Sequence, residues 1–136
     1  MTSISVALRA AMAGPVLVMA LVATSCGSSE ADGEVEVAPP REAVALIGSG
    51  DYVVLDVRTV EAFEAGHVAG AVSLPYRAPG FGSRLRELDK DERYLVYSRS
   101  GDAASEVTDR MVAEGFDGVV DAGAFGLLAI AGAPLD

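Results

Sequence analysis

The chain is short of the residues that build thiol and metal sites: its 136 residues include one cysteine, Cys26, one histidine, His67, and no tryptophan. A single cysteine excludes an intramolecular disulfide, a Cys-x-x-Cys redox pair and a cysteine-based metal cluster. The sequence therefore predicts no metal site and no other cofactor.

Positive charge is also scarce, since 10 lysines and arginines face 20 aspartates and glutamates, for a net charge of −10. Such a chain repels the phosphates of nucleic acids, so no nucleic-acid partner is expected. Charge this far from zero also keeps a protein soluble and monomeric, and we expect a monomer. At this length the chain has room for one domain with a core of ordinary size.

The amino-terminal segment has the order typical of an export signal. Arg9 precedes an apolar run over residues 10–23, and small residues lead up to Cys26. This order of charge, apolar run and small residues predicts a signal peptide over residues 1–25. The run is interrupted by Gly14-Pro15 and is shorter than the roughly 20 residues that a membrane-spanning helix needs.

The segment Ala23-Thr24-Ser25-Cys26 resembles a bacterial lipobox, although Ala23 stands where that motif usually has leucine. The resemblance implies that Cys26 carries a fatty acyl group such as palmitate on its sulfur and becomes the new amino terminus. Residues 26–33 are small and polar, which is typical of a flexible tether. We therefore expect an extracytoplasmic lipoprotein anchored to the cell membrane, with plain secretion or an uncleaved anchor as the alternatives.

From residue 34 to residue 136, apolar runs of strand length alternate with segments of helical period. This alternation predicts a single α/β domain with a mostly parallel, five-stranded sheet flanked by helices. Strands are expected over residues 34–37, 51–57, 71–74, 94–97 and 118–121, and helices over 40–47, 60–65, 83–88, 103–114 and 124–131. Residues 51–57 form a continuous apolar run, as expected of a central strand buried on both faces.

Glycines and a threonine mark the expected helix ends. Gly48 and Gly50 are predicted to end the first helix, and Gly66 the second. Thr59 is predicted to cap the start of the second helix.

The loop after the strand at 94–97 is the main candidate for a ligand site, because open parallel sheets bind ligands beyond the carboxyl ends of their strands. It runs directly into a helix, so its N–H groups can converge on an anion with the help of the helix dipole. The loop comprises Ser98, Arg99, Ser100, Gly101, Asp102 and Ala103. Arg99 is the side chain in it best suited to contact an anion.

Several motifs follow one another in this part of the chain. They are Asp56-Val57-Arg58, Glu61, Gly66-His67-Val68-Ala69-Gly70 up to Pro75, the loop that begins at Ser98, Gly115-Phe116 and Gly132-Ala133-Pro134. In this order they resemble the rhodanese-like domain family, over about residues 34–136.

The resemblance implies a specific chemistry. An active rhodanese uses a cysteine at the first loop position to take sulfane sulfur from a donor such as thiosulfate, forming a persulfide that it passes to cyanide or another acceptor. The loop N–H groups, and often an arginine at the last loop position, stabilise the anionic sulfur. Here the first position is Ser98 and the last is Ala103, while Asp102 adds a negative charge.

These departures argue against catalysis. A cysteine thiol titrates near about 8.5, whereas a serine hydroxyl stays protonated and cannot carry a persulfide. The Gly-x-Ser-x-Gly elbow of serine hydrolases is absent, because Val96 occupies its first glycine position. The resemblance implies a structural role for His67, and Asp56 with Arg58 is expected to brace neighbouring loops.

The sequence thus favours a non-catalytic rhodanese-like module that binds a protein or a small anion through residues 98–103. Two alternatives remain. One is an enzyme, either a sulfurtransferase acting with a partner's thiol or a hydrolase of the rhodanese-related phosphatase kind, which also calls for a loop cysteine. The other is a purely structural envelope protein.

Overall fold

The computed structural model describes residues 34–136. The predicted signal peptide, Cys26 and the tether lie outside the described residues. In the described part, no helix combines the length and the apolar character needed to cross a membrane.

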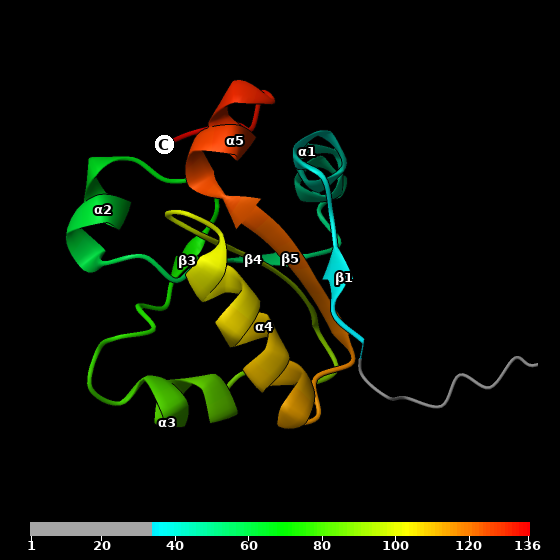
Figure 1. Ribbon diagram of the computed structural model, residues 1–136, viewed down its shortest axis with the longest axis vertical. Coiled ribbons are helices and arrows are strands. Elements are labelled where there is room, and N and C mark those ends of the chain that lie inside the picture. The colour runs from blue at the N-terminus through cyan, green and yellow to red at the C-terminus, as the bar shows by residue number, and fades with distance from the viewer. Residues whose placement is uncertain (1–33) are drawn as a thin grey trace, which may run out of the picture.

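One five-stranded sheet organises the domain, with the strand order β1-β5-β4-β2-β3 (Figure 1). Every strand pair is parallel, so the predicted α/β class is confirmed and the sheet is parallel throughout. The strands are β1 (Glu36–Val37), β2 (Val53–Asp56), β3 (Val72–Ser73), β4 (Arg93–Ser98) and β5 (Gly118–Ala124). The predicted strand over 51–57 is β2, which lies inside the sheet, although β4 occupies its centre.

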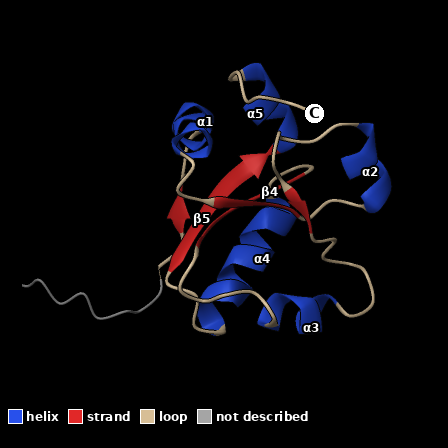
Figure 2. Cartoon of the chain, turned by 180° about the vertical axis from the view of Figure 1, so that it is seen from behind, coloured by secondary structure: helices blue, strands red, loops and turns tan. Residues whose placement is uncertain are grey.

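Helices cover both faces of the sheet (Figure 2). They are α1 (Pro40–Ser49), α2 (Val60–Ala65), α3 (Phe81–Arg86), α4 (Asp102–Ala113) and α5 (Phe125–Ile130). Alternate residues of β4 point to opposite faces. Val96 therefore packs in the apolar cluster under α3 and α4, and Leu95 packs in the cluster under α1 and α5.

Several helix ends lie where the sequence places them. The Thr59 side chain accepts the Ala62 N–H at 3.2 Å and so caps α2, and Gly66 ends that helix. Of the two glycines predicted to end α1, Gly48 does not, because the helix continues to Ser49, and Gly50 does. The cap is Gly50, whose positive φ of 77° is a conformation that other residues rarely adopt.

Other boundaries shift by a few residues. Helix α3 begins at Phe81, two residues before the predicted start, because the Phe81 side chain is part of the core. Strand β5 continues beyond the predicted end at Asp121, since Ala124 pairs with Ser98 at the end of β4. Ser98 is thus the last residue of a strand and not a loop residue.

Candidate functional site

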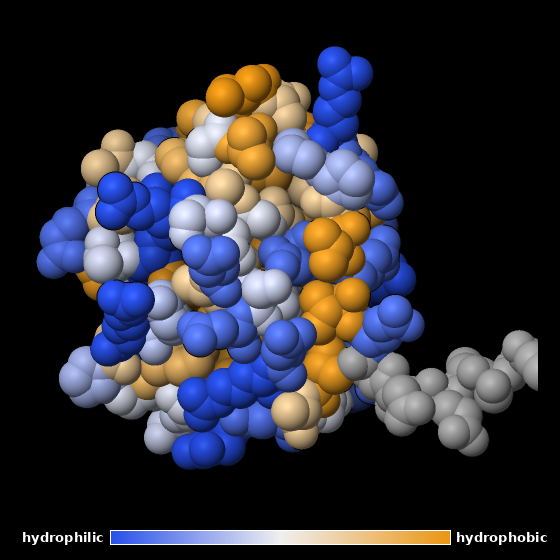
Figure 3. Space-filling view, viewed as in Figure 1, coloured by the Kyte–Doolittle hydropathy of each residue, from blue (hydrophilic) through white to orange (hydrophobic). Residues whose placement is uncertain are grey.

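A pocket of about 690 Å³ opens at the carboxyl ends of the strands, where the sequence predicts the ligand site. Three segments line it: residues 57–62 after β2, residues 75–78 after β3, and residues 98–103 except Gly101 after β4. In Figure 3 the recess lies beside α2, with apolar residues inside it and hydrophilic residues around its rim.

Ser98 lies in the wall of this pocket and is almost completely buried, with 1% of its surface exposed. Its Oγ accepts hydrogen bonds from the N–H groups of Gly101, at 3.0 Å, and Ala104, at 3.2 Å. Gly101 has a φ of 93°, which turns the chain sharply enough for its N–H to face back toward the end of β4. One N–H group of the loop, that of Gly101, and one in the first turn of α4, that of Ala104, are therefore directed at the Ser98 side-chain oxygen.

No general base is positioned to activate this hydroxyl. Within residues 34–136, no carboxylate or imidazole lies within hydrogen-bond distance of Ser98 Oγ. The ring of His67 stacks on Phe63 with centroids 3.8 Å apart, and its Nδ1 lies 2.9 Å from the Phe63 carbonyl oxygen. His67 thus ties the end of α2 to the following loop, in keeping with the structural role that its motif implies.

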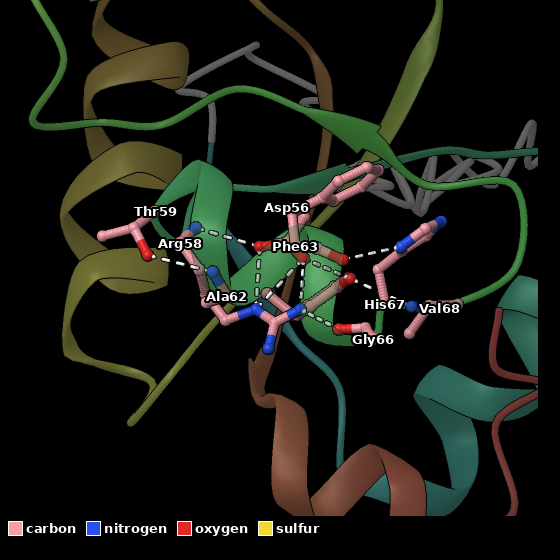
Figure 4. Close-up of polar contacts among 9 residues, drawn as sticks. Asp56, Arg58, Thr59, Ala62, Phe63, Gly66, His67 and Val68 are labelled. Atoms are coloured by element: carbon pink, nitrogen blue, oxygen red, sulfur yellow. Dashed lines mark hydrogen bonds and ion pairs between the residues drawn. The ribbon is translucent and has the colours of Figure 1, made fainter.

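Asp56 and Arg58 form the centre of a buried polar network (Figure 4). Asp56 is fully buried, and its carboxylate accepts hydrogen bonds from Arg58 Nε at 3.0 Å and from Arg58 Nη2 at 2.6 Å. Arg58 Nη2 also donates to the Gly66 carbonyl at 2.7 Å. The Tyr97 hydroxyl donates to Asp56 at 2.7 Å and accepts the Val68 N–H at 3.1 Å. This geometry braces the loop between α2 and β3, as predicted for the Asp56–Arg58 pair.

Two members of the network were not predicted from the sequence. Tyr97 joins Asp56 across 41 positions of sequence, and the guanidinium of Arg58 lies 4.0 Å from the centre of the Phe125 ring. Burial raises the pKa of Tyr97, and the hydrogen bond to Asp56 raises it further. The phenol is therefore neutral and serves as a fixed hydrogen-bond donor to Asp56.

The fold and the motifs agree with a comparison against known families, in which the rhodanese-like domain matches residues 39–124. The chain belongs to the rhodanese-like domain family. Among its curated relatives is the thiosulfate sulfurtransferase GlpE of Pseudomonas putida. That protein is 33% identical over 87 residues, which cover 62% of this chain and 77% of the relative.

Solved structures show the same fold. The rhodanese-like domain of an Anabaena protein superposes with a TM-score of 0.64 at 21% identity, covering 76% of this chain and 79% of that domain. A protein from Lactobacillus plantarum gives a TM-score of 0.57 at 28% identity, over 69% and 80% of the two chains. The chain is thus a rhodanese-like domain with sulfurtransferase homologues.

Within this rhodanese-like site, the remaining loop residues surround the mouth of the pocket. Arg99, Ser100 and Asp102 are exposed and Ala103 is half-buried, and all four line the pocket. Gly101 acts only through its backbone. The structure brings together the six residues that the sequence singled out, 98 to 103, while Asp56 and His67 lie behind them and outside the pocket lining.

The charges that line the pocket nearly balance. Arg58 is paired with Asp56, so it contributes little free charge. Arg77 and Arg99 then oppose Glu61 and Asp102. Residues 34–136 contain no group of three or more histidine, cysteine or acidic side chains placed to hold a metal ion.

Proposed function

We propose that the chain is a non-catalytic rhodanese-like domain that binds an anionic ligand through residues 98–103. In this proposal the domain is tethered outside the cytoplasmic membrane through an acylated Cys26. The observation that carries the proposal is the Ser98 side chain, a neutral hydroxyl held by two N–H groups at the position where the family keeps its nucleophile.

The chemical argument concerns both the nucleophile and its activation. A persulfide needs a sulfur atom, and residues 34–136 contain no cysteine. A serine nucleophile would need an adjacent base held by a third group, and none contacts Ser98 within the described residues. The loop nevertheless keeps the geometry of an anion site, since it runs from a strand into the amino terminus of α4.

The tether is supported by the sequence alone. The apolar run over residues 10–23 and the small residues before Cys26 are the features that favour export and acylation. With Cys26 acylated, the mature chain would hold no free thiol at all.

The test compares Ser98 with a restored cysteine. Both proteins carry Cys26→Ser, so that any thiol chemistry must come from position 98. We expect no cyanide-dependent turnover of thiosulfate or 3-mercaptopyruvate by the Ser98 protein, and measurable turnover by Ser98→Cys on the same scaffold. Turnover by the Ser98 protein that Ser98→Ala abolishes would refute the proposal.

A further inference from the structure

The pocket is larger than an inorganic anion requires. Its volume of about 690 Å³ lies within the range of roughly 300–1,000 Å³ that is typical of sites for organic ligands. Thiosulfate or phosphate bound at the loop would leave most of this space filled with water.

Most of the wall is apolar. The apolar side chains that line the pocket belong to Val57, Val60, Ala62, Pro75, Tyr76, Ala78 and Ala103. Ala103 stands at the last loop position, where its methyl group adds apolar surface and no charge. Val60 is 46% exposed, so the apolar wall continues to the pocket mouth. Covering such a surface with the apolar body of an organic ligand is favourable, because it removes apolar surface from water.

The polar end of the pocket offers hydrogen-bond donors. The oxygen of Ser98 already accepts two N–H groups, and no acceptor among residues 34–136 lies within reach of its own proton. Asp102 and Ala103 are the first two residues of α4, so their N–H groups have no partner inside the helix. All three residues line the pocket. A ligand therefore meets one O–H and two N–H donors on the loop side of a largely apolar cavity.

The low net charge of the side chains at the pocket mouth favours monoanions over dianions. Because Glu61 and Asp102 offset Arg77 and Arg99, the site supplies oriented dipoles but little net positive charge. A dianion such as thiosulfate or phosphate needs more positive charge than this to leave water. A carboxylate carries a single charge and suits N–H and O–H donors.

We infer that this pocket takes a small organic monocarboxylate. Its carboxylate accepts hydrogen bonds from Ser98 and from the first N–H groups of α4, and its apolar body packs against Val60 and Tyr76. The inference rests on the proposed anion-binding function and names the class of ligand.

Titration calorimetry and amide NMR shifts of the full chain test the ligand class, with phenylacetate, acetate, thiosulfate and phosphate as probes at equal ionic strength. We expect phenylacetate to bind at least tenfold more tightly than any of the other three. Its addition should shift the amides of Ser98, Asp102 and Ala103.

Two pairs of variants locate the site. Ser98→Ala should weaken phenylacetate binding by about tenfold to a hundredfold, as expected for the loss of one hydrogen bond to a charged group. Ser105→Ala, an exposed serine on the same helix and outside the pocket, should leave it unchanged. Ala103→Arg should reverse the preference toward thiosulfate, whereas Ala113→Arg, which adds the same charge at the far end of α4, should not.

The outcomes separate the two proposals. Thiosulfate binding as tightly as phenylacetate would overturn the ligand class and leave anion binding intact. Phenylacetate binding that is insensitive to Ser98→Ala and Ala103→Arg would place the ligand elsewhere and also overturn the inference. If no probe shifts the loop amides, the anion-binding function fails together with it.

Discussion

Two buried side chains at the carboxyl edge of the sheet, Ser98 and Asp56, are held by hydrogen bonds from their own loops. Gly101 in the loop after β4 and Ala104 in the first turn of α4 donate their N–H groups to Ser98, and the Arg58 N–H donates to Asp56 at 2.9 Å. Asp56, however, carries a charge that Arg58 neutralises, whereas Ser98 is neutral. The two positions should therefore respond very differently to the loss of their polar atoms.

Replacing Asp56 by asparagine removes the charge that compensates Arg58, whose side chain is only 8% exposed. Breaking a buried ion pair by removing one partner costs about 3–5 kcal/mol, so we expect a loss of that order in the free energy of unfolding. Urea denaturation measures it. Asp109→Asn, an exposed aspartate on α4, is the matched control and should change stability by less than about 0.5 kcal/mol. Equal losses in the two variants would contradict the role given to the network.

Tyr97 predicts a pH dependence at the alkaline end. Burial and the bond to Asp56 raise its pKa in the folded protein, whereas in the unfolded chain the phenol titrates near about 10. Above that pH the folded state binds more protons than the unfolded state, so stability falls as the pH rises. Below it, the contribution of Tyr97 is fully present.

The variant Tyr97→Phe should lower the free energy of unfolding at pH 8 by about 1–3 kcal/mol, because the Val68 N–H and an Asp56 oxygen lose a partner. It should also make the loss of stability above pH 10 less steep. Tyr94, whose pKa burial also raises, would account for part of the slope that remains. An unchanged alkaline slope would show that the Tyr97 phenol does not control it.

The sequence identified candidate site residues where their role depends on residues close to them in the chain. Asp56, Arg58 and the segment from Ser98 could be found because each lies at, or just beyond, the carboxyl end of an apolar strand. The role of Tyr97 could not, because its partner is 41 positions away and only the pairing of β2 with β4 brings the two together. As one residue of an apolar run, Tyr97 looks no different from any other core position.

At the level of elements, the start of α4 depends on the backbone of Gly101. An alanine Cβ at this position would make only ordinary contacts, the nearest being 3.7 Å from Gly123 Cα, so its cost is conformational. A residue other than glycine at a φ of 93° costs roughly 1–2 kcal/mol. We expect Gly101→Ala to destabilise the domain by that amount, measured by thermal or urea unfolding.

Gly48→Ala is the matched control for this change. Gly48 lies in α1 with nothing within 4 Å of an added Cβ, so alanine should stabilise that helix by about 0.5 kcal/mol. Gly101→Ala is therefore expected to lower the free energy of unfolding, and Gly48→Ala to raise it. Stabilisation by Gly101→Ala would mean that the loop does not require the positive φ.

Glycine was also a source of a wrong boundary, because its preference for turns does not say which glycine makes the turn. Gly48 and Gly50 were both expected to end α1, and Gly50 alone does so. The last strand was expected to end at Asp121. In the structure the Asp121 carboxylate accepts the Gly123 N–H at 2.9 Å, and β5 continues to Ala124. These choices are made by tertiary contacts that no local pattern encodes.

For the whole molecule, the alternation of apolar runs and helical segments was sufficient to predict an α/β domain with a parallel sheet. It did not predict the strand order, because a short, mostly apolar strand such as β2 carries no information on which strand lies beside it. The order matters for function, since it places the loops after β2, β3 and β4 around one pocket.

The proposed acylation of Cys26 is a property of the whole chain. Each acyl CH₂ buried in a bilayer contributes about 0.8 kcal/mol, and a net charge of −10 offers no electrostatic attraction to anionic lipid in its place. We therefore expect the native chain in the membrane fraction and Cys26→Ser in the soluble fraction. In a second variant, Cys26→Ser with Ser105→Cys, the thiol is present but lies on the exposed face of α4 in the folded domain, and this protein should also be soluble. Mass spectrometry of the mature amino terminus gives the direct answer: an acylated Cys26 at position one supports the tether, whereas a free thiol or a longer terminus would exclude it.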